Sequence, residues 1–467
     1  MSRYIDFKTA VTSAFKDCFD FAVREFGTEG ARCAVMFIIG ITSRDFIAEA
    51  ILRPLLRTNV YEFDGDFLRV IESPVLKPPN DELEAINRIA AGEALILTES
   101  KNGTFFTLTS AQFTHGRSVQ EPTSDVTMRG AKGGFVEDAE KNCALLRKYV
   151  RTSDFKINAF NVGSVSKTQV LLCYVKGRAD EKLISELQKR ITSIKASVIT
   201  DSANVAMLLG AKRQIPLPDF GSSEKIDKVA SKLMAGRIGI IVDGSPFVLT
   251  LPFLFIEGLQ SADDYLHTPI YATFIRVLRF FAFISAIFAP AILCTVINYN
   301  PKIIPPEFYG IIQDARKDIP LSFFWEILAI LILFELLREV GVRMPRTVGD
   351  AVGIVGSIIL GNTAVESGLV SSIGVITVAF SAVCAFITPA YMYVIVLSRL
   401  ITLITSELFG VWGLVASAAG LLLLLCCKKS FGVRYTYPLI PFNARALQDG
   451  VFCSPKRTLG RRERLKK

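Results

Sequence analysis

Long uncharged runs in the C-terminal half of the chain set the strongest limit on its fold. Residues 367–398 form a stretch of 32 residues without Asp, Glu, Lys or Arg, and residues 280–297 and 408–427 are also free of charge. A helix needs roughly 20 apolar residues to cross the hydrocarbon core of a bilayer. The sequence therefore predicts an all-α, polytopic membrane domain over residues 271–428.

The number of spans depends on segments that contain charges. Pro389 is expected to end a crossing inside the longest uncharged run, and the next segment, 391–406, contains Arg399. Residues 321–337 and 351–365 are shorter and are interrupted or bordered by carboxylates, which fit a span where they face protein or water instead of lipid. We therefore expect four to six spans.

The excess positive charge lies after the last apolar run. Residues 428–467 contain eleven Lys or Arg and two Asp or Glu, a difference of +9 that equals the formal net charge of the whole chain. A basic segment beside a span is retained in the cytoplasm and attracted to anionic lipid. The charges therefore favour a basic cytoplasmic tail over residues 429–467 in contact with membrane lipid, and no nucleic-acid partner.

The first 270 residues alternate between β-type runs and helical periods, which predicts an α+β region. Expected strands are 94–98, 104–108, 156–159, 168–175, 197–200 and 238–242, and expected helices are 81–91, 136–149, 180–192 and 224–234. A polar segment rich in Gly, Ser and Thr, 116–134, divides a first subdomain over 1–135 from a second over 136–270. Charged residues interrupt the first turns, so we expect no secretory signal and a cytoplasmic N-terminal region.

This N-terminal region offers little chemistry. The two histidines, His115 and His267, are far apart, and the nine cysteines form no CxxC pair, so no metal site or cofactor is predicted. The glycines of 130–134 match neither GxxxxGK[ST] nor GxGxxG, which favours a structural loop over a phosphate cradle. Asp263 and Asp264 lack a neighbouring nucleophile, and a helix-capping or interfacial role is favoured over acid–base catalysis. No catalytic residues are predicted.

Residues 349–369 combine small and polar side chains in a helical pattern. At about 100° per residue, one face collects small side chains that would let a neighbouring helix approach closely, namely Gly349, Gly353, Ser357, Gly361, Ala364 and Gly368. The opposite face carries Asn362, Val365, Glu366 and Leu369. These four could line an aqueous path, or their polar members could bond to other helices or reach the interface, and the periodicity alone leaves both readings open.

A charged cluster follows the second expected span. It consists of Glu335, Arg338, Glu339 and Arg343. Spacings of three and four residues place opposite charges side by side on one helix. We interpret the cluster as an ion-pair network at the inner rim of the membrane, in preference to a gate or a contact between subunits.

Several motifs, taken together, resemble the A subunit of the GerA-type spore germinant receptor. Residues 334–345 (FELLREVGVRMP) are similar to the family's FELLREAGxRLP, residues 353–371 to its GxVxGxxxxGxxAVxAGLVS, and residues 430–435 (SFGVRY) to its SFGxPY. In the N-terminal half, residues 129–137 (RGAKGGFVE) resemble RGPxEGFVE, and residues 243–247 match DGSPF. The motifs follow the family's order over nearly the full chain.

The resemblance implies a non-enzymatic, multi-pass subunit of a nutrient sensor in the inner spore (cell) membrane. Its expected partners are a transporter-like B subunit, to which the family assigns nutrient binding, and a lipoprotein C subunit. Family models assemble A subunits into a homo-oligomeric ring, expected to be a pentamer, around a cation channel that the nutrient opens. Transferred to this chain, the pore helix becomes 353–369, with Val365 and Leu369 as constrictions and Asn362 and Glu366 as polar lining.

Other functions predict other features. A secondary-transporter subunit would bind a coupling cation at Glu335 or Glu366 and would show an internal repeat, which the sequence lacks. A membrane-anchored enzyme would show a nucleophile–base or metal constellation, and none is found. A scaffold that only docks its partners fits the same sequence.

Overall fold

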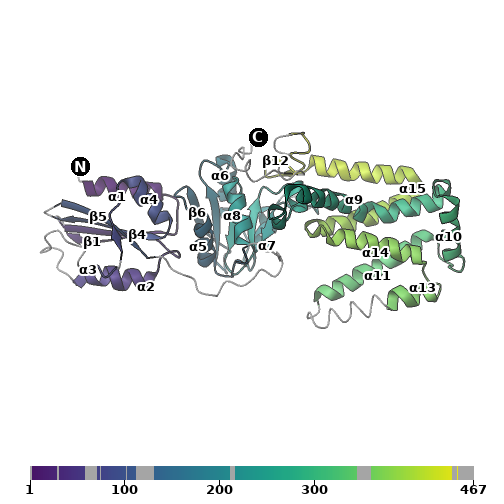
Figure 1. Ribbon diagram of the computed structural model, residues 1–467, viewed down its shortest axis with the longest axis horizontal. Helices are drawn as coiled ribbons and strands as arrows, with labels where there is room; N and C mark the ends of the chain where they lie inside the picture. Colours follow the sequence, from purple (N-terminus) through teal and green to yellow (C-terminus); the bar gives the residue numbers. More distant parts are fainter. Residues whose placement is uncertain are drawn as a thin grey trace. The chain divides into compact units, whose positions relative to one another are not determined.

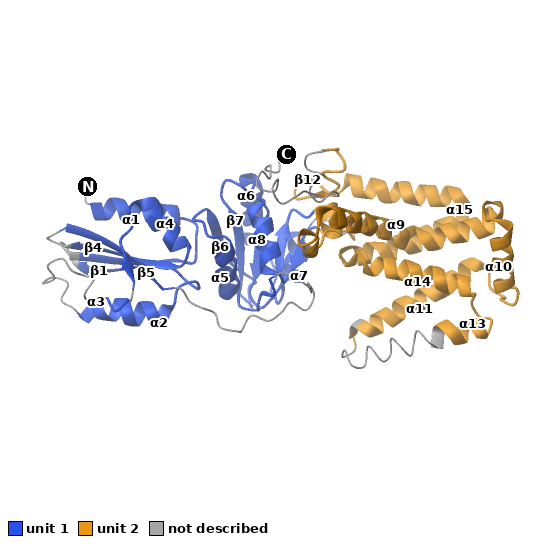
Figure 2. Cartoon of the chain, in the orientation of Figure 1, with its two compact units in different colours: residues 1–212, 219–253, 460–467 blue, residues 213–218, 254–459 orange. Residues whose placement is uncertain are grey.

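A computed structural model describes residues 3–28, 31–57, 71–73, 75–100, 103–111, 131–210, 216–343, 359–443 and 450. The chain divides into two compact units (Figure 2). Unit 1 comprises Met1–Lys212, Asp219–Phe253 and Gly460–Lys467, and unit 2 comprises Arg213–Pro218 and Leu254–Leu459.

The first part of unit 1 is a five-stranded antiparallel sheet in the order β1-β2-β4-β5-β3. Its strands are β1 (Phe21–Thr28), β2 (Ala31–Ile38), β3 (Leu76–Lys77), β4 (Glu93–Ser100) and β5 (Gly103–Ser110). Successive residues of a strand point to opposite faces, and both faces here are apolar. A sheet of this kind must be covered on both sides.

Helices cover both faces of this first sheet (Figure 1). On one face lie α1 (Arg3–Ala14) and α4 (Glu82–Ala90), and on the other α2 (Arg44–Phe46), the π-helix η1 (Ile47–Leu52) and α3 (Arg53–Arg57). The strand residues alternate between two cores: Met36 and Leu95 join the core of α1 and α4, whereas Val35 and Ile96 join the core of η1 and α3. The sheet is therefore the middle of three layers.

A second antiparallel sheet follows in the order β6-β7-β9-β10-β8. It contains β6 (Phe155–Val162), β7 (Thr168–Val175), β8 (Gly221–Ser223), β9 (Ile238–Val242) and β10 (Val248–Leu251). Helices α5 (Ala139–Tyr149) and α8 (Ile226–Met234) share one apolar core with it, and α6 (Glu181–Thr192) and α7 (Ser202–Leu209) contact the strands outside that core. The N-terminal region is thus α+β, as predicted, and the structure shows that it contains two sheets.

A buried ion pair links the two sheets of unit 1. The Arg147 guanidinium on α5 donates to both Asp20 oxygens, at 2.6 Å and 2.9 Å, and both side chains are excluded from solvent. Burial lowers the pKa of Arg147, but the adjacent Asp20 carboxylate more than reverses this and raises it. Beside this pair, Cys18 forms a parallel bridge with Ile157 on β6.

Most of the expected elements of unit 1 are present, with one clear error. β7 and β9 have the predicted bounds, and α5 begins three residues later than predicted, after the cap Asp138. The predicted strand 197–200 is wrong. Its backbone instead bonds to a neighbouring loop, where Val165 N–H donates to the Ser197 carbonyl and Ile199 N–H donates to the Ser166 hydroxyl.

Unit 2 is helical (Figures 1 and 2). Its longer helices are α9 (Pro269–Tyr299), α10 (Pro306–Arg316), α11 (Phe323–Arg343), α14 (Ser372–Phe386) and α15 (Met392–Cys427). Among the described residues, two helices are long and apolar enough to cross a membrane, Pro269–Tyr299 and Pro389–Cys427. Their most apolar 18-residue windows have mean hydropathies of 2.4 and 2.2. α14 ends before the short helix η7 (Pro389–Tyr391), where Pro389 was predicted to end a crossing.

α15 is two helical segments that meet at Gly410. The backbone there has φ 58° and ψ −135°, a left-handed conformation that glycine adopts without steric cost. A Cβ on Gly413 would overlap the carbonyl oxygen of Thr405. Residues eight apart on a straight helix are about 12 Å apart along its axis, so the chain must reverse direction at Gly410. The count of four to six spans stays a prediction.

Candidate functional site

The predicted pore helix is described only in its last part. Residues 344–358 lie outside the described residues, and with them Gly349, Gly353 and Ser357. The described part consists of a π-helix, η6 (Ile359–Thr363), followed directly by α13 (Ala364–Glu366). We call residues 359–369 the candidate pore segment.

The helix ends at Glu366, so the prediction of one helix through Leu369 is wrong at its end. Gly368 has φ 68°; its N–H donates to the Val365 carbonyl, and the Leu369 N–H donates to the Ala364 carbonyl. This pair of bonds is the Schellman motif, which needs a residue in the left-handed conformation just after the helix. Gly368 therefore ends the helix and does not extend the small-residue face. Leu369 lies beyond the end of the helix, so helical spacing does not determine which way its side chain faces.

Three of the predicted pore-lining side chains in the candidate pore segment are exposed to solvent. Asn362, Glu366 and Leu369 are exposed, Leu369 by 59%, whereas Val365 is half-buried. In the described part of the chain, neither Asn362 nor Glu366 has a hydrogen-bond partner. A methyl group on Gly361 would meet no atom within 4 Å. The described chain thus supplies no neighbour at Gly361 for the predicted helix packing, and that role, like that of Ala364, stays a prediction.

A buried carboxylate fixes the chain just after this segment. Glu326, in the first turn of α11, is fully buried, and its Oε1 accepts the Ser371 N–H at 2.8 Å and the Ser371 hydroxyl. Its other oxygen lies 3.5 Å from Nε of Arg316 on α10. Carboxylates in an apolar bundle are costly unless they are bonded in this way.

A second polar cluster joins four helices of unit 2. Arg399 on α15 is 2% exposed; it donates to Glu335 on α11 at 2.5 Å and to the Ser381 hydroxyl on α14 at 3.0 Å. Ser381 in turn donates to the Ala286 carbonyl on α9 at 2.8 Å. The charge of Arg399, which interrupts the apolar segment 391–406, is therefore held inside protein, where a charged side chain is tolerated.

The charged cluster of α11 forms ion pairs of two kinds. Glu335 is half-buried; it lies 2.8 Å from Arg338 and also binds Arg399. Glu339 lies 2.7 Å from Arg343, and both of these side chains are exposed. Exposed pairs contribute little to stability. Their predicted location at the inner rim of a membrane stays a prediction.

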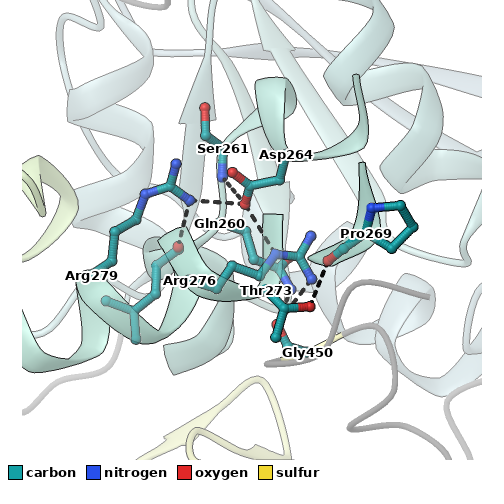
Figure 3. A network of polar contacts seen from close by, with 9 residues as sticks. Gln260, Ser261, Asp264, Pro269, Thr273, Arg276, Arg279 and Gly450 are labelled. Carbon is teal, nitrogen blue, oxygen red and sulfur yellow. Dashed lines mark hydrogen bonds and ion pairs between the residues drawn. The ribbon is translucent and has the colours of Figure 1, made fainter. Parts of the chain in front are cut away.

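A third cluster lies at the start of α9 (Figure 3). Asp264 caps the short helix η4 (Ala262–Tyr265) together with Ser261, which fits the predicted capping role. Its Oδ2 also accepts from Arg276 at 3.0 Å and from Arg279 at 2.8 Å. Arg276 and Gln260 further donate to the Gly450 carbonyl, each at 3.1 Å. This cluster was not predicted from the sequence, although Arg276 and Arg279 lie one helical turn apart.

The matched motifs of the sequence contact other parts of the chain. Tyr435, from the SFGVRY motif, accepts the Phe255 N–H at its carbonyl, and the Tyr391 hydroxyl donates to the Phe255 carbonyl. In unit 1, Asp243 of DGSPF accepts the Ala139 N–H at 3.2 Å. Gly134 of the glycine-rich loop forms a backbone bridge with Lys225. The described part of this loop thus has the structural role that was favoured.

The residues that the structure describes offer no metal-binding cluster. They contain no group of three or more His, Cys, Asp or Glu side chains placed to hold a metal ion. What unit 2 offers instead is a set of polar groups held within apolar helices. Such groups in a membrane protein mark helix packing or pathways for ions and substrates.

Comparisons with known proteins identify the family. The model of the Bacillus/Clostridium GerA spore germination protein matches residues 9–465. Spore germination protein KA of Bacillus subtilis (strain 168) is 33% identical over 90% of this chain and 78% of its own length. Spore germination protein GerLA of Bacillus cereus is 28% identical over 94% of this chain and 91% of its own length.

A solved structure also matches. It is the N-terminal domain of the A subunit of the Bacillus megaterium spore germinant receptor GerK3. The two sequences are 25% identical, the match covers 53% of this chain and 94% of the solved one, and the TM-score is 0.41. The family model spans nearly the whole chain, in agreement with the motifs in both halves. The chain therefore belongs to the GerA family of spore germination proteins.

Proposed function

We propose that this protein is the membrane subunit of a nutrient (germinant) receptor that triggers spore germination, and that copies of it form the oligomeric, nutrient-gated cation channel. The observation that supports conduction is the candidate pore segment. Asn362 and Glu366 are exposed there without partners in the described chain, next to the half-buried Val365. Polar groups alternating with an apolar constriction are the elements from which ion pathways are built.

The proposal includes the setting in which the chain works. The protein spans the inner spore membrane several times, with its N-terminal region and basic tail in the cytoplasm. It assembles as a ring, with a pentamer as the expected form, and with a transporter-like B subunit and a lipoprotein C subunit. Family membership and the two long apolar helices support this setting.

Replacing Val365 with Ala tests the conduction path. The change removes two methyl groups from the constriction. Each apolar carbon contributes about 0.8 kcal/mol to the free energy that keeps water out. Water should therefore enter the constriction more easily, and the nutrient-independent leak should rise about tenfold. The measurement is cation efflux from vesicles that contain the assembled receptor. The matched control is Val415→Ala, on an exposed apolar face of α15, which should leave the leak unchanged. A silent, normally responsive Val365→Ala receptor would contradict the placement of the constriction.

A second function is a scaffold or transporter-type subunit of the same receptor, without its own conduction path. The exposure of Asn362 and Glu366 also suits a surface that docks a different subunit. In that case Val365→Ala would weaken assembly with the partner subunits and would produce no leak. Co-purification of the subunits, measured beside the efflux, separates the two functions.

A further inference from the structure

Glu326 connects three helices of unit 2 at one point. It lies on α11, its Oε1 accepts two hydrogen bonds from Ser371 at the start of α14, and its Oε2 faces Arg316 of α10 at 3.5 Å. The Arg316 guanidinium is itself held over the ring of Phe323, 4.8 Å from the ring centre. A fully buried carboxylate with this number of contacts has little freedom to move.

The fit around Glu326 is close. Ser371 caps α14, because its hydroxyl accepts the Gly374 N–H at 3.1 Å. A Cβ on Gly374 would overlap Glu326 Oε1, so glycine at this position allows the carboxylate to reach the helix end. Negative charge is stabilised at the N-terminal end of a helix by the aligned backbone dipoles. The link between Glu326 and α14 is therefore electrostatic as well as geometric.

The residue held by Glu326, Ser371, comes two residues after the end of the candidate pore segment. The helix ends at Glu366, the Schellman turn at Gly368 follows, and Ser371 is three residues further along. The turn also lies against the α10–α11 connection, since a Cβ on Gly368 would be 3.8 Å from the Asp318 carbonyl oxygen. Glu366 thus lies only five residues from a fixed point.

We propose that Glu326 is a positioning residue for the candidate pore segment: by holding Ser371, it sets the orientation of Val365 and Glu366. This inference rests on the proposed function for its effect on conduction, but not for its effect on structure. Without the link, the segment samples more orientations, and the constriction at Val365 is formed for a smaller share of the time. Both the nutrient-independent leak and the accessibility of position 366 should then rise.

The test compares graded variants of the full receptor in vesicles. Glu326→Leu removes both acceptor oxygens, and because hydrogen bonds to charged groups are strong, the leak should rise about tenfold. Glu326→Gln retains a carbonyl oxygen for Ser371 and should stay within about twofold of the native leak, since a neutral acceptor still bonds. Ser371→Ala, which retains the backbone bond, should fall between them. The matched control is Thr377→Ala on α14, whose hydroxyl donates to the Ile373 carbonyl of its own helix.

A second measurement is independent of conduction. Glu366→Cys is introduced into each variant, and the rate at which a membrane-impermeant thiosulfonate labels that cysteine is followed by mass spectrometry of the peptide. Glu326→Leu should raise this rate, whereas Glu326→Gln and Thr377→Ala should not. If labelling rises in Glu326→Leu but no variant leaks, including Val365→Ala, the positioning role stands and the channel proposal fails.

Unchanged labelling in an assembled Glu326→Leu receptor would overturn the inference. If Glu326→Leu does not assemble, Ser371→Ala decides in its place. An increase in the labelling rate for Ser371→Ala supports the positioning role, and a labelling rate equal to that of Thr377→Ala contradicts it. An equal increase for all variants, the control included, would show general loosening of the helices and would also contradict it.

Discussion

Buried charged side chains in this protein bind partners that are distant in the sequence. Arg147 binds Asp20 over 127 residues, Arg399 binds Glu335 over 64, and Glu326 binds Ser371 over 45. In each case the charge is matched by oriented donors or acceptors. Removing one member of such a pair leaves the other buried without compensation, which costs far more than the pair itself contributes.

Asp20→Ala should therefore destabilise unit 1 strongly. It leaves the Arg147 guanidinium buried and unpaired, and the expected loss is about 3–5 kcal/mol of unfolding free energy. Denaturant unfolding of the full chain in detergent, followed by a probe in the N-terminal region, measures it. The control is Glu140→Ala, which breaks the exposed pair with Arg44 and should change stability by less than about 1 kcal/mol. Equal effects would contradict the role of the buried pair.

At the level of single residues, the sequence alone could predict capping and the ion pairs within one helix, but not the pairing of residues on different helices. Asp264 was expected to cap a helix because the signal for a cap is local. Its bonds to Arg276 and Arg279, and the pairing of Arg399 with Glu335, depend on how helices pack, which no short window of sequence contains. Gly368 was assigned to helix packing, because a glycine at this spacing can either pack against a neighbouring helix or end its own helix. Its left-handed conformation shows that it ends the helix.

At the level of elements, the apolar pattern predicted the helices well and their ends less well. Pro389 separates α14 from α15 as expected, because proline cannot continue the hydrogen bonding of a helix. The reversal at Gly410 was not predicted, since a glycine in an apolar run gives no sign of its φ angle. The structure makes the helical residues on either side of Gly410 into a hairpin.

Gly410→Ala and Gly413→Ala should both disrupt this hairpin. The first places a side chain in the left-handed conformation, at a cost of about 1–2 kcal/mol, and the second forces a methyl group against the Thr405 carbonyl. Both variants should melt earlier in detergent than the native protein. Gly420→Ala is the control, because a methyl group there meets nothing within 4 Å and alanine favours a helix. A melting temperature for Gly413→Ala equal to that of Gly420→Ala would contradict the reversal.

At the level of the whole molecule, the two compact units contain different structural features. Unit 1 holds two sheets, and its described residues contain no metal-binding cluster. Unit 2 contains the long apolar helices, the polar clusters within them and the candidate pore segment. Family membership identifies a spore germination protein, and conduction by this chain is the proposal that connects its polar clusters to that process.

Planar-bilayer recording of the purified chain, assembled with its partner subunits, tests this proposal most directly. We expect a quiet baseline without nutrient, cation currents when nutrient is added, and a raised baseline in the Val365→Ala receptor. Assembly of the ring is verified by mass photometry on the same preparation. A flat trace in every condition, from native and Val365→Ala receptors whose assembly is intact, would contradict the claim that this subunit forms the channel.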